Sequence, residues 1–175
     1  MCYSVEAVAN FFIEKSLKTE TPLSNMHLQK MVFFAHAAYF KQYRKPLFSD
    51  PVVAWQHGPV VVSLYHKLKK YEAGSVTEPI QRIETCADNR FLQYRTVIPT
   101  IPQEHEDVVK FLNKAWNSLS EVPTWKLRAI SHAPGGAWYK TVESQQIDPM
   151  DDQVVMDKLP RNLTILDSVI QECGR

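Results

Sequence analysis

The chain has 175 residues, of which 45% are hydrophobic and 22% charged, and its formal net charge at pH 7 is +1. This composition excludes a disordered chain and is typical of one folded domain with an ordinary apolar core. The near-neutral charge gives no whole-molecule attraction to nucleic acid or to an acidic membrane surface. We therefore expect a single domain over residues 1–175 that does not bind nucleic acid by itself.

Two helices are predicted first along the chain. Apolar residues at helical spacing follow Ser4, a candidate N-cap, and predict a helix that runs to about Lys15. Ser24 is the candidate N-cap of a second helix, which the segment Arg44-Lys45-Pro46 ends. This second helix is apolar around much of its circumference, which is typical of a helix at the centre of a fold.

The segment from Pro46 to Pro59 is predicted to be an irregular linker. Pro59 fits the first turn of a third helix, because its missing N–H is not needed there and its φ is already helical. That helix is predicted to run to Tyr71, with Gly74 as its C-cap.

The remaining elements are predicted to be one hairpin and several short helices. Pro79–Glu84 and Phe91–Val97 are rich in β-formers and predict a small hairpin. Helical patterns follow Pro102 and Pro123, and a glycine loop leads to Trp138. Two more short helices are predicted over 151–160 and 163–173. The fold class is therefore mainly α, a compact domain of about six to eight helices with a small β-hairpin near the middle.

The cysteines and the apolar runs predict a cytoplasmic protein without a membrane anchor. Cys2, Cys86 and Cys173 lie far apart, and no Cys or His pair has the spacing of zinc ligands, so we expect reduced thiols. The first residues carry Glu6 and no basic segment, so they do not resemble a signal peptide. No apolar run approaches the roughly 20 residues of a membrane span.

The stretch Ala54–Val61, AWQHGPVV, allows two interpretations. Gly58 can adopt a positive φ and Pro59 fixes the next φ, so the pair predicts an abrupt turn from loop to helix, anchored by a buried Trp55. Alternatively, the first N–H groups of that helix point outward, where an anion or a partner's carboxylate can dock. The residues by themselves leave both interpretations open.

The sequence contains no nucleotide-binding, phosphate-binding, metalloprotease or serine-hydrolase motif. The six histidines are interpreted as surface or satisfied core residues, and nothing places a cysteine beside His132 for catalysis. The basic run His66–Lys70 is interpreted as a solvated helix face. We therefore expect no enzyme activity, no cofactor and no metal site.

Three segments carry a resemblance when they are taken together. They are Leu28–Ala35 (LQKMVFFA), Ala54–Val60 (AWQHGPV) with Tyr65 five residues on, and Leu127–His132 (LRAISH) with Trp138 beyond. In this order and spacing they resemble the Panacea domain family, which includes SocA-like antitoxins and the phage-associated GepA proteins. The resemblance covers about residues 5 to 145. One departure is Ala137, which stands where the family tends to have a proline before the tryptophan.

The resemblance implies a mainly helical bacterial or phage protein with no enzyme activity and no required cofactor. It implies an antitoxin that neutralises a cognate toxin, encoded next to it, by direct protein–protein binding. An alternative is a proteolytic adaptor that delivers the toxin to a Clp-family protease. Alternatives outside the resemblance are an enzyme with an unrecognised site and a prophage-associated regulator.

Within the matching segments we expect two groups of residues. The expected partner-binding residues are Gln56, His57, Tyr65, Ser131 and His132. The expected structural residues are Gln29, Lys30, Trp55, Gly58, Pro59 and Trp138. His132 has a second interpretation, as a residue that stabilises the C-terminal dipole of its helix. The tryptophans expected in the core are Trp116, Trp125 and Trp138.

Overall fold

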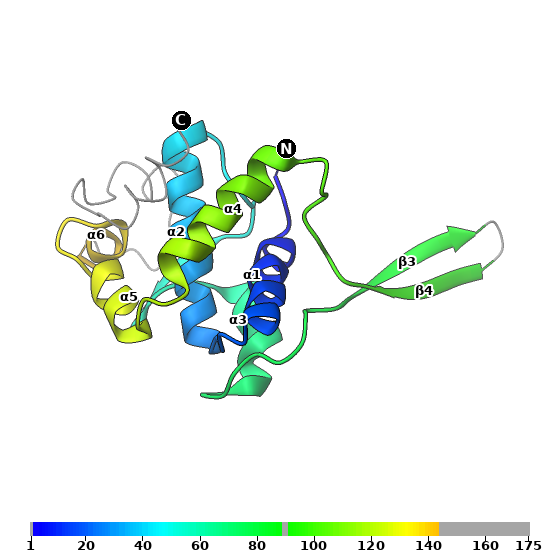
Figure 1. The fold of residues 1–175 in the computed structure, drawn as a ribbon, viewed down its shortest axis with the longest axis horizontal. Helices are drawn as coiled ribbons and strands as arrows, with labels where there is room; N and C mark the ends of the chain where they lie inside the picture. Colours follow the sequence, from blue (N-terminus) through cyan, green and yellow to red (C-terminus); the bar gives the residue numbers. More distant parts are fainter. Residues whose placement is uncertain (1, 89–90, 144–175) are drawn as a thin grey trace.

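Helix α2 (Asn25–Tyr43) lies at the centre of the fold (Figure 1). The structure is a computed structural model that describes residues 2–88 and 91–143. Every residue of α2 from His27 to Tyr39 is buried. The helices that pack against it are α1 (Val5–Thr19), α3 (Val62–Leu68), α4 (Glu106–Leu119) and α5 (Thr124–Ser131). The prediction of a central helix is confirmed, and it follows from the apolar residues all around α2.

Serine caps begin the first two helices. Ser4 and Ser24 each accept a hydrogen bond of 3.2 Å from the backbone N–H three residues along, so both predicted N-caps are confirmed. Helix α2 ends where it was predicted to end. Helix α1 runs further than predicted, to Thr19 rather than to about Lys15, and Glu20 then adopts the left-handed conformation with a φ of 54°.

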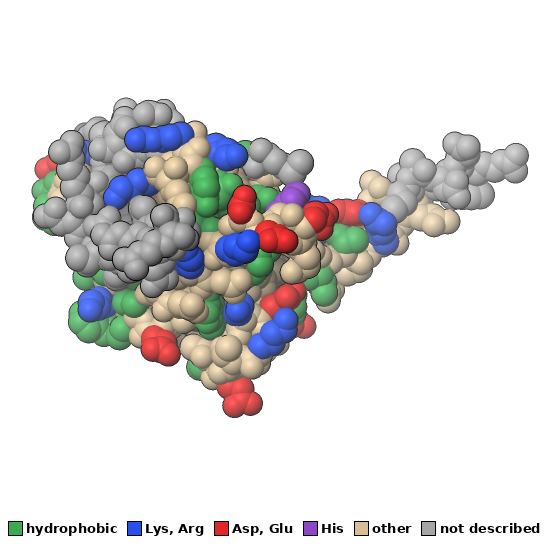
Figure 2. All heavy atoms as spheres, turned by 45° about the horizontal axis from the view of Figure 1, so that its top comes forward, with side chains coloured by type: hydrophobic (Ala, Val, Ile, Leu, Met, Phe, Trp, Pro, Cys, Tyr) green, Lys and Arg blue, Asp and Glu red, His purple; other side chains and the backbone are tan. Residues whose placement is uncertain are grey.

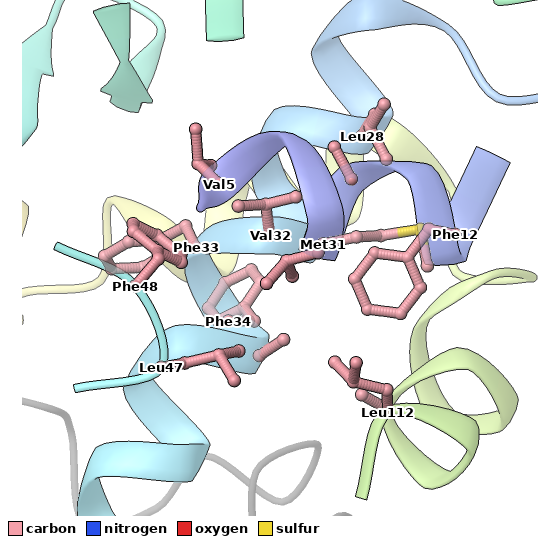
Figure 3. Close-up of a cluster of buried hydrophobic side chains, with 14 of the residues drawn as sticks. Val5, Phe12, Leu28, Met31, Val32, Phe33, Phe34, Leu47, Phe48 and Leu112 are labelled. Carbon is pink, nitrogen blue, oxygen red and sulfur yellow. The ribbon is translucent and has the colours of Figure 1, made fainter. Parts of the chain in front are cut away.

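One hydrophobic core joins α1, α2, α4 and the segment after α2 (Figure 3). Phe12 of α1, Phe34 of α2, Phe48 and Leu112 of α4 are at most 1% exposed. Burial of a side chain of this size stabilises the fold by roughly 1.5–3 kcal/mol. The core therefore fixes α2, including its first two turns, relative to the rest of the molecule.

The stretch predicted to be a linker and a helix start is a β-hairpin, so that prediction was wrong. Strand β1 (Val52–Trp55) pairs antiparallel with β2 (Gly58–Val61), and Gln56 and His57 form the two-residue turn. Gly58 has a φ of 103°, which lets the chain reverse within this turn. Pro59 lies in β2 rather than in a helix, which is possible because a strand of a two-stranded sheet has a free edge that needs no N–H donor. The valines on both strands favour this pairing.

Helix α3 begins at Val62 and continues into a short 3-10 turn, η1 (Lys69–Tyr71). The predicted end at Tyr71 is confirmed. The prediction of Gly74 as the C-cap was wrong, because Glu72 takes the positive φ of 48° there. Gly74 instead donates its N–H to the carbonyl of Tyr71 at 2.7 Å.

The second hairpin, predicted near the middle of the chain, is confirmed. Strand β3 (Arg82–Asp88) pairs antiparallel with β4 (Phe91–Val97), and the pair projects from the body as an arm (Figure 1). Buried Asn10 of α1 holds the root of this arm. Its Nδ2 donates to the carbonyls of Ile80 (3.0 Å) and Pro99 (2.9 Å), and its Oδ1 accepts from the N–H of Ile80 (2.7 Å). The backbone before Arg82 is therefore bonded to α1, and the strand starts later than predicted.

Charged side chains of both signs are scattered over the described part of the face that Figure 2 shows. Lys and Arg side chains lie interspersed with Asp and Glu side chains over the body and at the root of the arm. This distribution agrees with the formal net charge of +1.

Helices α4 and α5 confirm the helical patterns predicted after Pro102 and after Pro123, whereas α6 (Ala137–Glu143), which follows the glycine loop, was not predicted. Trp116 is buried and Trp138 is partly buried against the core. Trp125 is 72% exposed, so its predicted core position was wrong. The reason is the helical period, since Leu127 of α5 faces the core and a residue two positions earlier lies on the opposite side.

The described residues thus form a mainly α fold with six α-helices and two small antiparallel sheets, where one was predicted. The two helices predicted over 151–160 and 163–173 lie outside the described residues. Among the helices of the described part of the chain, none is long and apolar enough to cross a membrane.

Candidate functional site

The three segments singled out in the sequence meet at Gly58, the first residue of β2. A Cβ atom added at Gly58 would lie 2.6 Å from Lys30 Nζ, 2.8 Å from Ser131 Oγ and 3.0 Å from His132 Cε1. Real Cβ atoms essentially never lie closer than 3.0 Å to another heavy atom, so a side chain at position 58 would displace Lys30 and Ser131. The hairpin β1–β2 is therefore held between α2 on one side and the end of α5 on the other.

Gln29 holds strand β2 on α2. Its Oε1 accepts a hydrogen bond from the N–H of Val61 at 3.0 Å, and its Nε2 donates to the carbonyl of Val61 at 3.4 Å. Gln29 is 3% exposed, so both groups bond out of contact with water. A buried N–H or C=O without a partner costs about 1–3 kcal/mol, and Gln29 removes this cost at the end of β2.

Lys30 lies one residue further along α2 and is 1% exposed. Its Nζ donates to the carbonyl of Pro59 at 2.9 Å, and no described carboxylate forms an ion pair with it. Burial, followed by the positive charge of Arg128, lowers the pKa of Lys30 to about 7. The amine of Lys30 is thus a buried group beside the hairpin, partly protonated near pH 7, with the carbonyl of Pro59 as its partner.

His132 and Trp138 hold the outer side of the hairpin. The Nδ1 of His132 lies 2.7 Å from the carbonyl of Arg128 and its Nε2 lies 3.4 Å from the carbonyl of Gln56. The ring of Trp138 lies 3.8 Å from that of His132, and its Nε1 donates to the carbonyl of Trp55 at 2.8 Å. The backbone carbonyls of Trp55 and Gln56 are therefore both contacted by side chains of the α5–α6 region.

A pocket of about 570 Å³ opens on the side of the hairpin that faces the start of α2. Its lining residues are Asn25, Met26, Gln29, Lys30, Trp55, Gln56, His57, Val60, Tyr65 and Glu72. Trp55 is 39% exposed, so the expectation that it is a buried anchor was wrong. Its ring instead meets the ring of Tyr65 edge-on at 5.0 Å, and the two aromatic rings belong to one wall of the pocket.

The residues predicted to bind a partner divide into two groups in the structure. Gln56, His57 and Tyr65 line the pocket. Ser131 and His132 lie behind the hairpin, in contact with Gly58, and they do not line the pocket. The structure therefore gives Ser131 and His132 contacts within the protein, while Gln56 and His57 stand exposed at the hairpin tip.

Four pocket residues, Asn25, Met26, Val60 and Glu72, were absent from the predicted site, although Val60 lies within the matching stretch Ala54–Val60. Asn25 and Met26 precede Gln29 and Lys30 by four positions, so each pair shares a face of α2, and helical periodicity was a signal that pointed to them. Glu72 follows η1 and approaches the pocket only through the tertiary fold. No sequence pattern pointed to Glu72.

The site does not have the geometry of a serine nucleophile. Ser131 Oγ lies 3.2 Å from His132 Nδ1, but the hydroxyl donates to the carbonyl of Arg128 at 2.8 Å, and Gly58 closes the space above it. Metal chemistry has no ligand set either, since the described residues contain no group of three or more His, Cys, Asp or Glu side chains that can hold a metal ion. What the arrangement offers is a rigid, partly apolar pocket suited to binding.

Comparison with known proteins gives two matches. Residues 28–139 match the family described as antitoxin SocA-like, Panacea domain. The chain is 29% identical over 132 residues to Antitoxin SocA of Caulobacter vibrioides (strain NA1000 / CB15N), across 75% of this chain and 66% of the relative. The match thus spans just under two thirds of that relative's length. No solved structure matches the chain.

Proposed function

Because this chain belongs to the antitoxin SocA-like, Panacea domain family, we propose that it is the antitoxin of a toxin–antitoxin pair. In this proposal it neutralises a cognate toxin by direct binding, and the toxin is encoded next to it. The observation that carries the proposal of direct binding is the pocket beside the hairpin β1–β2, together with the exposed hairpin tip.

The pocket has the features of a protein-binding hot spot. Two of the large hydrophobic side chains that the body exposes, Met26 (41%) and Trp55 (39%), line it together with Tyr65. Tryptophan and tyrosine are enriched among the residues that contribute most to binding energy, and hot spots gather in pockets that a partner's side chain can fill. Polar residues at the rim, among them Gln56 and His57, supply hydrogen bonds for orientation.

The rigidity of the hairpin supports the same role. Its backbone is held by Gln29, Lys30, His132 and Trp138, whereas the side chains of the tip residues Gln56 and His57 make no hydrogen bond within the described chain. A surface that is already ordered loses little conformational entropy when a partner binds, and this improves affinity. The tip residues are thus available to a partner on a frame that does not need to rearrange.

Growth rescue combined with alanine substitution tests the proposal. The neighbouring open reading frame is expressed with and without this chain, in cells that have or lack the Clp protease. Direct neutralisation predicts rescue in both strains and a stable complex of the two purified proteins. Rescue that requires the protease would show an adaptor instead, and a harmless neighbour would remove the proposal's main support.

The binding surface is tested in the same system by matched tryptophan variants. Trp55→Ala removes a pocket wall and is expected to weaken toxin binding by roughly 2 kcal/mol, or about 30-fold in Kd. Trp125→Ala removes an indole that is more exposed and lies outside the pocket, and it should leave Kd unchanged. Equal effects of the two variants would place the interface elsewhere.

A further inference from the structure

The pocket lies over the first two turns of α2, where a positive partial charge is not compensated. Asn25, Met26, Gln29 and Lys30 line it from one face of this helix end. A helix N-terminus carries roughly half a positive charge, and acidic residues in the first turn normally offset it. Helices α1 and α4 have such residues, whereas α2, like α3, α5 and α6, has none in its first turn.

Lys30 adds a full positive charge to the same wall when it is protonated. No described carboxylate pairs with it, and the charge that acts on it most is the like charge of Arg128. Burial and Arg128 together lower the pKa of Lys30 to about 7, so the folded protein holds the ammonium in an unfavourable environment. A negatively charged group in the pocket would stabilise the protonated form of Lys30.

Asn25 supplies an independent sign that the pocket wall is incomplete. The residue is 7% exposed, and its Oδ1 is buried without a hydrogen-bond partner. Its Nδ2 also makes no hydrogen bond within the described residues. A buried carboxamide is normally bonded; the unpaired Oδ1 is an acceptor, and a turn of the amide by 180° exchanges it for the Nδ2 donor that a carboxylate needs.

We propose that this pocket receives an acidic side chain, Asp or Glu, that the toxin carries on an apolar segment. Its carboxylate accepts hydrogen bonds from Lys30 and Asn25 at the N-terminus of α2, and the neighbouring apolar side chain packs against Trp55 and Met26. The volume of about 570 Å³ is large enough for both groups. This inference rests on the proposed antitoxin function, since it names the chemistry by which the toxin is recognised.

Glu72 completes the charge pattern around the pocket. Glu72 is exposed and carries the negative charge of the lining, so it repels a carboxylate that approaches along its side. A partner's acidic group is therefore directed toward the α2 wall, where Lys30 lies. His132 is near Lys30 but lies behind Gly58, outside the pocket.

The test uses a matched pair of small probes with the full chain. 3-Phenylpropionate and 3-phenylpropanamide have the same apolar body, but only the first carries a carboxylate. In NMR titrations followed at Trp55, Tyr65 and Lys30, the carboxylate is expected to bind at least about tenfold more tightly than the amide, because hydrogen bonds to a charged group are the stronger ones. Bound propionate should also raise the pKa of Lys30.

Two variants complete the experiment. Lys30→Met is expected to remove the preference for the carboxylate, whereas Lys126→Met, which removes an exposed charge outside the pocket, should keep it. If Lys30→Met does not fold, the two probes and the pKa of Lys30 in the unaltered chain still decide the matter. Equal binding of the two probes, or shifts at Trp55 without any at Lys30, would overturn the inference.

The same variants separate this inference from the function on which it rests. If the unaltered chain rescues growth and Lys30→Met binds the purified toxin as tightly as the unaltered chain does, the inference of an acidic side chain is wrong and the antitoxin role stands. If the unaltered chain gives no rescue, the proposed function itself fails. A loss of toxin affinity in Lys30→Met, with unchanged affinity in Lys126→Met, supports both.

Discussion

The two hairpins of this protein are joined to the rest of the molecule in different ways. Hairpin β1–β2 has only four residues in each strand, yet buried side chains from α2 and partly buried ones from the α5–α6 region bond to its backbone. The arm, β3–β4, has seven residues in each strand, and beyond its root Glu84 bonds to Arg82 and Arg95 of the arm itself. A lone two-stranded hairpin is marginally stable in water, so the shorter hairpin is expected to be the more rigid. Its rigidity comes from hydrogen bonds to side chains of other elements rather than from strand pairing.

The largest expected effect is the pH dependence that Lys30 gives to the frame of β1–β2. Folding lowers the pKa of Lys30 from 10.5 to about 7, so the unfolded chain binds more protons between these values. The unfolding free energy of the unaltered protein, relative to that of Lys30→Met, should therefore rise as the pH increases from about 7 to 10.5. It should decrease again by the same amount as the pH is lowered to about 7. The difference is on the order of 5 kcal/mol, since the pKa falls from 10.5 to about 7 and each pKa unit corresponds to about 1.4 kcal/mol. Urea unfolding of both proteins across this range measures it, and parallel curves would contradict it.

Gly58→Ala is expected to break the frame at its most crowded point. The new methyl group would lie 2.6 Å from Lys30 Nζ at a φ of 103°, so strain and overpacking act together and cost about 2–4 kcal/mol. Gly135→Ala is the control, because Gly135 also has a positive φ of 78° but nothing lies within 4 Å of the added atom. Unfolding free energies should differ by at least about 1 kcal/mol between the two variants. Equal costs would mean that backbone strain alone matters at Gly58.

Gln29→Ala separates the frame from the tip of the same hairpin. It leaves the buried N–H of Val61 without an acceptor, which should cost about 1–3 kcal/mol. Gln56→Ala, at the exposed tip, should leave the unfolding free energy nearly unchanged. Chemical denaturation of both variants tests this contrast, and a similar loss in the two would show that the tip residue is structural as well.

Glu84→Gln in the arm is expected to have the smallest effect. Hydrogen bonds from Arg82 and Arg95 lower the pKa of Glu84, yet these ion pairs are at the surface, where salt and water weaken them. The thermal midpoint of the whole protein should not change measurably.

Amide exchange of the unaltered protein should show the same difference between the hairpins, with slow exchange at Val61 and fast exchange along β4. Slow exchange along β4 would mean that the arm is held by more than its own pairing.

The sequence predicted those elements whose signals are local. Ser4 and Ser24 mark helix starts, and the apolar residues of α2 indicate a central helix without knowledge of its neighbours. The hairpin β1–β2 was missed because Gly58-Pro59 is equally typical of a helix start, and what selects the strand is the bond between Gln29 and Val61, 32 positions apart.

The candidate site was predictable to a lesser extent. Gln56, His57 and Tyr65 were expected at a binding surface and line the pocket, but whether they bind a partner stays a prediction. The exposure of Trp55 depends on where Tyr65 and Trp138 lie, and that is decided by tertiary packing. The convergence of Lys30 and Ser131 on Gly58 joins three distant segments, so no local period indicates it.

Asn10 makes the arm a separable part. Its three hydrogen bonds hold the incoming chain at Ile80 and the outgoing chain at Pro99, so both ends of the arm are fixed on α1 whatever lies between them. Segments bounded in this way tolerate insertion, shortening and replacement, because a change in their length does not alter the packing of the core. We therefore expect that the segment between Ile80 and Pro99 can be replaced by a peptide tag or a foreign hairpin without disturbing the pocket.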